Sequence, residues 1–237
     1  MNRSKKLGIV YLITFAIMIF LNYWSATNVG NVADANQPLL QPAGFAFSIW
    51  GFIYFLLFIW VIRAFFVKND AVYENTSYLP ALNFLLNGCW ILAFTAQALL
   101  TSVVIIFALL VTLILIYGRI NNTPHTFFEK LPFSIYIGWV SVASILNVFV
   151  WFVGMEQTVF LGMDELTWTF ITLSVVTIIA ILFSIRFKDF IYTIVFIWAY
   201  IGIYAKTPND TLKTFVMILI LLLIVIFIYT LYKFFKK

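Results

Sequence analysis

Aromatic and carboxamide side chains recur at intervals of three or four residues along three apolar stretches of the chain. Such intervals place side chains on one face of an α-helix. These groups offer π-surfaces for stacking and neutral donors and acceptors for hydrogen bonds, so the chemistry they indicate is recognition. The three stripes comprise Phe47, Trp50 and Tyr54; Asn83, Asn87, Trp90, Phe94 and Gln97; and Tyr136, Trp139, Ala143, Asn147 and Trp151.

A purely structural interpretation of the stripes competes with a binding site. Amides inside membranes commonly hydrogen-bond across helices and hold them together. Tryptophans near helix ends gather at the membrane interface, which is how we interpret Trp24 and Trp168. A surface that faces lipid gains nothing from asparagine. We therefore expect the stripes to face inward, around a cleft or a polar packing seam.

Groups suited to catalysis are scarce. His125 is the only histidine and Cys89 the only cysteine, so the three or four convergent ligands of a zinc site are not expected. All nine carboxylates fall in predicted loops or at helix ends. Acids inside the membrane usually mark proton relays, and their absence argues against a proton-coupled transporter. We expect no catalytic residue, no metal, no cofactor and no enzymatic activity.

The composition places these stretches in a membrane. Of the 237 residues, 64% are hydrophobic and 10% are charged, whereas soluble domains are about half apolar. Several apolar runs reach the roughly 20 residues that cross a hydrocarbon core. We predict an all-α fold, a polytopic membrane helical bundle of eight transmembrane helices. They are expected at residues 7–26, 44–67, 78–99, 102–119, 131–153, 167–185, 190–205 and 214–235.

The basic residues predict an orientation for these eight spans. Loops on the cytoplasmic side of a membrane protein carry an excess of lysine and arginine. With eight spans, only Lys206 and Lys213 fall on one side, and the other twelve of the 14 basic residues fall on the side of both termini. We therefore expect a multi-pass protein of the cell membrane with both termini cytoplasmic. Clusters placed in this way are not a nucleic-acid footprint, and no nucleic-acid partner is expected.

The longest predicted outer segment is loop 1, residues 27–43, with the sequence TNVGNVADANQPLLQPA. Its asparagine, glycine and proline content predicts an irregular, polar connection. Pro42 fits the first turn of the second helix, where no backbone donor is lost. Loop 1 could act as a lid over a ligand bound near the interface.

Three elements of the stripes resemble a known family. FAFSIWGFIY, residues 45–54, resembles the F-x-x-V-W-x-x-L-Y signature of the TspO/MBR family, the translocator proteins or tryptophan-rich sensory proteins. LLNGCWILAF, residues 85–94, resembles that family's L-N-x-x-W-x-x-x-F element. GWVSVASILNVFVW, residues 138–151, resembles its W-V-x-x-A-x-x-L-N-x-x-x-W element. Ala43 and Phe45 stand where the family's W-x-P-P-like sequence would place proline and tryptophan.

The resemblance implies a TspO/MBR-like five-helix membrane bundle over residues 1–155 and three additional transmembrane helices over residues 156–237. It also implies that planar hydrophobic molecules, such as porphyrins or sterols, bind in a pocket opening toward loop 1. A tetrapyrrole would be a ligand rather than a cofactor. The residues that match the family's pocket-lining motifs are Trp50, Tyr54, Asn87, Trp90, Phe94, Trp139, Ala143 and Asn147.

Three functional hypotheses follow. The first is an integral membrane protein that binds a planar hydrophobic ligand in an aromatic cleft and has a sensory or regulatory role. The second is a transporter or exporter of a small amphipathic solute that uses the same cleft. The third, an eight-span lysoplasmalogenase-like hydrolase, has the right size but lacks acids or histidines within the membrane. Expected partners are membrane lipid and a hydrophobic small molecule. The sequence is also compatible with a homodimer.

Overall fold

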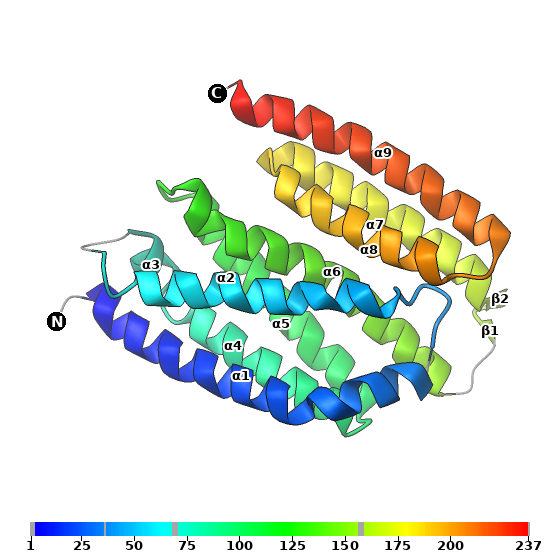
Figure 1. The fold of residues 1–237 in the computed structure, drawn as a ribbon, viewed down its shortest axis with the longest axis horizontal. Coiled ribbons are helices and arrows are strands. Elements are labelled where there is room, and N and C mark those ends of the chain that lie inside the picture. Colours follow the sequence, from blue (N-terminus) through cyan, green and yellow to red (C-terminus); the bar gives the residue numbers. More distant parts are fainter. Residues whose placement is uncertain (1–2, 36, 68–70, 156–158, 237) are drawn as a thin grey trace. The chain divides into compact units, whose positions relative to one another are not determined.

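The computed structural model describes residues 3–35, 37–67, 71–155 and 159–236, and in these ranges all side chains except those of residues 26–31, 33–34 and 160. The chain clusters into two compact units. The first comprises residues 1–36 and 50–151, and the second comprises residues 37–49 and 152–237. Figure 1 shows that helices dominate both units. The all-α prediction is confirmed.

The first unit consists of α1 to α5 and most of α6 (Figure 1). The chain supplies no proline between residues 1 and 37, and α1 accordingly continues without interruption until shortly before Pro38. A proline disfavours helix in the residue that precedes it. The bounds are α1 (Arg3–Ala35), α2 (Ile49–Arg63), α3 (Ala71–Thr76), α4 (Leu79–Thr95), α5 (Leu99–Asn121) and α6 (Phe127–Gly154).

Helices α1 and α4 pack closely and run parallel. Near their starts, the Tyr11 hydroxyl donates to the Ser77 carbonyl oxygen. Near their other ends, Asn22 Nδ2 donates to Asn87 Oδ1 at 2.8 Å. Gly88 permits the close approach, because a methyl group there would lie 2.7 Å from Leu21 Cδ1. Parallel packing is what a first and a third membrane span require when the chain reverses direction at each crossing.

Helices α2 and α6 run antiparallel and meet through an ion pair and aromatic side chains. Arg63, at the end of α2, lies 2.7 Å from Glu129 in the first turn of α6. Trp50, at the start of α2, meets Trp139 further along α6, with ring centroids 6.3 Å apart. This direction agrees with spans two and five of the predicted topology. The antiparallel packing also brings the stripe that contains Trp50 into contact with the stripe that contains Trp139.

The second unit contains three long helices, and segment 37–49 packs on one of them. Helices α7 (Glu165–Phe187), α8 (Phe190–Lys206) and α9 (Asp210–Phe235) contact one another. Their starts are capped by the side chains of Asp164, Asp189 and Asn209, which accept hydrogen bonds from backbone N–H groups of the first turn. Segment 37–49 includes a 3₁₀ helix, η1 (Gly44–Ser48), that packs on α8.

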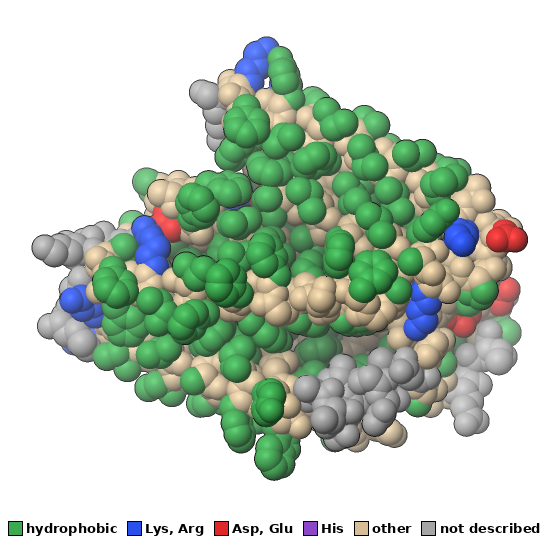
Figure 2. All heavy atoms as spheres, in the orientation of Figure 1, with side chains coloured by type: hydrophobic (Ala, Val, Ile, Leu, Met, Phe, Trp, Pro, Cys, Tyr) green, Lys and Arg blue, Asp and Glu red, His purple; other side chains and the backbone are tan. Residues whose placement is uncertain are grey.

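The helices are long and apolar enough for a membrane bundle. Within the described ranges, six candidate spans meet the length and hydropathy that a crossing needs, and α4 and α8 are shorter apolar helices of 17 residues each. Seventeen residues lie at the lower end of the range for transmembrane helices. Figure 2 shows apolar side chains over much of the visible surface. The membrane fold is therefore confirmed, and the count of eight spans stays a prediction.

The start of the second span differs from the prediction for Pro42. Pro42 precedes the 3₁₀ helix η1 and is not in the first turn of an α-helix. The backbone N–H of Ala43 donates to the Gly202 carbonyl oxygen of α8 at 3.0 Å. Because this bond fixes the segment against α8, the chain enters α2 through a 3₁₀ turn.

Loop 1 is also shorter than predicted. The prediction ended the first helix at residue 26, whereas α1 continues to Ala35. One glycine, Gly30, costs a helix only about 1 kcal/mol and does not end it. Between α6 and α7 the prediction had no strands, and the structure has a hairpin of β1 (Val159–Phe160) and β2 (Met163–Asp164).

Candidate functional site

The predicted stripes converge on the indole ring of Trp50 in α2. This ring stacks on Trp90 of α4, with centroids 5.7 Å apart and planes at 29°. It meets Tyr136 and Trp139 of α6 edge-on, at 6.0 and 6.3 Å. Tyr54, one turn along α2, lies 5.6 Å from the same ring. Three helices separated in the sequence thus build one aromatic cluster.

A hydrogen-bonded chain of side chains lies next to this cluster. The Tyr54 hydroxyl donates to Asn22 Oδ1 at 2.9 Å. Asn22 Nδ2 donates to Asn87 Oδ1 at 2.8 Å, and Asn87 Nδ2 donates to the Tyr136 hydroxyl at 2.8 Å. Asn87 and Tyr136 are completely buried. Because each amide carries both a donor and an acceptor, the chain links α2, α1, α4 and α6 in series.

A second chain joins α4, α6 and α5. The indole N–H of Trp90 donates to Asn147 Oδ1 at 2.7 Å. Asn147 Nδ2 donates to Ser102 Oγ at 2.8 Å, and that hydroxyl donates to the Leu99 carbonyl oxygen at 2.7 Å. The chain ends on a backbone acceptor. The polar atoms of Trp90 and Asn147 therefore form hydrogen bonds that join helices α4, α6 and α5.

All eight predicted site residues lie in the first unit, and the structure links seven of them by ring contacts or side-chain hydrogen bonds. Phe94 joins through Trp90, whose ring centroid lies 5.7 Å away. Ala143 is buried on α6, one turn from both Trp139 and Asn147. Whether these residues bind a ligand stays a prediction.

The outer members of the stripes lie elsewhere. Gln97 follows the end of α4, is exposed and has a positive φ of 58°, because the chain turns sharply into α5 there. Asn83 faces α5 and donates to Thr112 Oγ1 at 2.7 Å and to the Leu109 carbonyl oxygen. Gln97 therefore forms part of the turn between α4 and α5, and Asn83 joins the two helices, as the structural interpretation of the stripes predicts.

Three residues of the hydrogen-bonded chains, Asn22, Tyr136 and Ser102, are absent from the predicted site, and each had a signal in the sequence. Asn22 is an amide within the apolar run IMIFLNYW, and an amide in a membrane helix needs a partner. Tyr136 belongs to the stripe that also contains Trp139. Ser102 gave a weaker signal, because serine is common in membrane helices.

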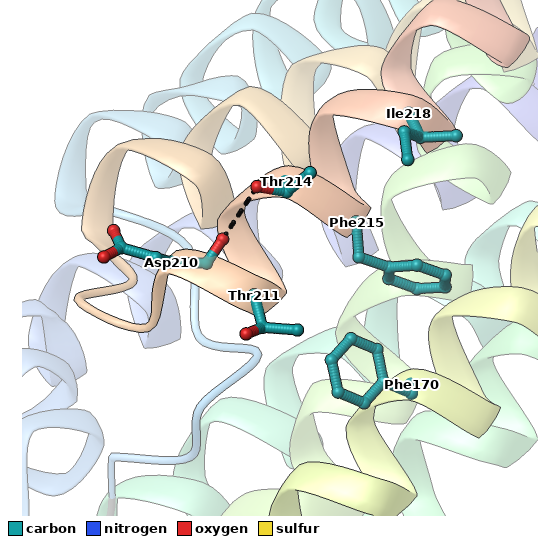
Figure 3. A pocket seen from close by; sticks show the side chains of 6 residues that line it. All are labelled: Phe170, Asp210, Thr211, Thr214, Phe215 and Ile218. Carbon is teal, nitrogen blue, oxygen red and sulfur yellow. Dashed lines mark hydrogen bonds between the residues drawn. The ribbon is translucent and has the colours of Figure 1, made fainter.

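A pocket is described in the second unit, and none of the predicted site residues lines it. It has a volume of about 480 Å³ and is open to the surface. Figure 3 shows Phe170 of α7 and Phe215 of α9 facing each other there, while the Asp210 carboxylate points away from both rings. Among the residues with a described placement, no group of three or more histidine, cysteine or acidic side chains could hold a metal ion.

Fold and site together define a class: a helical membrane bundle in which aromatic and amide side chains of several spans meet. The family model of TSPO-like proteins matches residues 8–232, and the chain belongs to the TSPO-like family. No match is found among curated proteins or among solved structures. The TspO/MBR resemblance is thereby confirmed. The match also continues through α7, α8 and most of α9, where the quoted sequence elements gave no resemblance.

Proposed function

We propose that this membrane protein binds a planar hydrophobic ligand, of a porphyrin or sterol type, against the indole rings of Trp50, Trp90 and Trp139. The observation that carries the proposal is the meeting of these rings from α2, α4 and α6 around Trp50. Aromatic faces attract flat ring systems in offset or edge-on geometries. Family membership supports the same function. The role we infer is sensory or regulatory, without catalysis.

The surroundings of the rings favour recognition over packing alone. Trp50 is only partly buried, although the rings it contacts on α4 and α6 are buried. Tyr136 and Trp139 meet the Trp50 ring edge-on, whereas Trp90 stacks on it. A flat molecule that displaced or extended this stack would gain aromatic contact from three helices without breaking the Trp90–Asn147 hydrogen bond.

The proposal is tested by titrating the purified full-length protein with protoporphyrin. Saturable quenching of tryptophan fluorescence and a shift of the porphyrin Soret band are expected. Trp50→Ala and Trp139→Ala should each weaken binding by about tenfold, since stacking of a ring system is worth about 1–3 kcal/mol. Trp24→Ala is the matched control, because Trp24 is 71% exposed on α1. Binding that both first variants leave unchanged would contradict the proposed site.

We also propose that the protein crosses the cell membrane with both termini in the cytoplasm. The charge distribution supports this orientation, because only Lys206 and Lys213 fall on the opposite side of an eight-span chain. Fusing a reporter that is active only outside the cytoplasm to the C-terminus should give no signal. The same reporter inserted at Pro208, between α8 and α9, should be active. The reverse result would overturn the orientation.

A further inference from the structure

The hydrogen bonds beside the aromatic cluster have a fixed direction, set by a backbone carbonyl. Asn22 Nδ2 lies 2.9 Å from the Met18 carbonyl oxygen, which can only accept. The amide of Asn22 must therefore turn its NH₂ group toward Met18 and its oxygen toward Tyr54, whose hydroxyl donates to it. The remaining hydrogen of Asn22 Nδ2 points to Asn87.

This direction passes along the chain to Tyr136. Because Asn22 donates to Asn87, the atom of Asn87 that faces it must be the oxygen, Oδ1. The NH₂ group of Asn87 then faces the Tyr136 hydroxyl and donates to it at 2.8 Å. Tyr136 is thus an acceptor in this pair, and its own hydroxyl proton is not used there.

That proton has no acceptor among the side chains and backbone atoms that the structure describes. Among the described residues, the only hydrogen bond of the Tyr136 hydroxyl is the one it accepts from Asn87. Tyr136 is completely buried, and a buried donor without an acceptor is unfavourable. By contrast, the hydroxyl at the end of the Trp90–Asn147 chain, that of Ser102, donates its proton to a backbone carbonyl.

The unused donor belongs to a residue of the aromatic cluster. The Tyr136 ring meets the Trp50 ring at 6.0 Å and 73°. We propose that the ligand carries a hydrogen-bond acceptor, a carbonyl or carboxylate oxygen on its edge, and that the Tyr136 hydroxyl donates to it. This inference rests on the proposed function, and it makes Tyr136 the residue that selects among planar apolar ligands. Rings with purely alkyl edges would bind less tightly.

The test compares three porphyrins of the same ring size on the full-length protein. Protoporphyrin carries two carboxyl groups, its dimethyl ester carries neutral carbonyls, and etioporphyrin carries alkyl groups alone. Both acceptor-bearing porphyrins should bind about tenfold more tightly than etioporphyrin, since a hydrogen bond to a buried acceptor is worth about one decade in affinity. Tyr136→Phe should remove that advantage, so that all three porphyrins bind with similar affinity.

Tyr54→Phe is the matched control within the same chain of hydrogen bonds. It also deletes one hydroxyl, but the direction set by Met18 remains and so does the unused Tyr136 proton. Its ratio of affinities should equal that of the unmodified protein. A Tyr136→Phe protein that loses affinity equally for all three porphyrins, or for none, would overturn the inference. If no porphyrin binds, or if Trp50→Ala has no effect, the proposed function itself fails.

Discussion

The guanidinium of Arg63 lies 2.7 Å from the carboxylate of Glu129 and ties the end of α2 to the first turn of α6. Glu129 is almost fully buried, and its other oxygen accepts hydrogen bonds from the backbone N–H and the hydroxyl of Thr126. The pair therefore joins α2 and α6 near one end, whereas Trp50 lies at the start of α2 and Trp139 lies in the middle of α6. Its position far from those rings makes it a structural rather than a ligand-binding element.

Removing one partner of this pair should destabilise the protein. Arg63→Gln removes the guanidinium from the buried Glu129 carboxylate, and breaking a fully buried pair costs about 3–5 kcal/mol. Because the Arg63 side chain is 35% exposed, we expect about 2 kcal/mol, measured as the shift in thermal unfolding of the full-length protein in detergent. Arg119→Gln is the control, since Arg119 is exposed and donates to the Asn75 carbonyl oxygen. Equal losses in both variants would contradict the role of the pair.

A second prediction concerns the link between Trp90 and Asn147. A double-mutant cycle of Trp90→Phe and Asn147→Leu should give a coupling free energy of about 1 kcal/mol, within the range measured for hydrogen bonds between membrane helices. Asn147→Leu alone should change porphyrin affinity by less than about twofold, because the amide is already used by Trp90 and Ser102.

The measurements that check this prediction are thermal unfolding and porphyrin titration of the two single variants and the double variant. Trp90→Phe keeps one aromatic ring for stacking and loses the five-membered ring that carries the indole N–H. A coupling near zero would mean that the hydrogen bond contributes nothing to stability. A large loss of porphyrin affinity in Asn147→Leu would instead make Asn147 a ligand contact.

Much of the fold was predictable because hydropathy and helix spacing act locally. A run of about 20 apolar residues is a span wherever it occurs, and a stripe such as Asn87, Trp90 and Phe94 must share a helix face. The stripe in α6 pointed to the same cluster as the stripe in α4. The sequence elements that resemble the TspO/MBR family supported the same cluster, since they include Trp50 and Trp139.

The partners of each amide could not be predicted, because they depend on the rotation and rise of one helix against another. A shift of one residue between α1 and α4 would separate Asn22 from Asn87. Local composition also misplaced the end of α1: polar residues with one glycine suggested a loop, yet the first proline in the sequence, Pro38, comes only after Ala35. Long-range packing decided the first case, and the absence of a proline before Pro38 decided the second.

Segment 37–49 offers a third prediction, because Gly202 of α8 lies directly against it. A Cβ at position 202 would lie 2.8 Å from Pro42 Cβ and 2.9 Å from Ala46 Cβ, closer than such atoms pack. Nearby, the Gly202 carbonyl oxygen accepts from the Ala43 N–H, and the Trp198 indole N–H donates to the Ala46 carbonyl oxygen. Gly202→Ala should therefore push the segment away from α8 and weaken both hydrogen bonds.

Overpacking of this kind costs about 1–3 kcal/mol, so Gly202→Ala should lower the thermal stability of the full-length protein and expose segment 37–49 to protease. Gly118→Ala is the matched control, because a Cβ there would meet nothing within 4 Å. That variant should be neutral or stabilised by up to about 1 kcal/mol, since alanine is the better helix former. If the two variants unfold at the same temperature and are cleaved at the same rate, Gly202 is not what allows the segment to pack on α8.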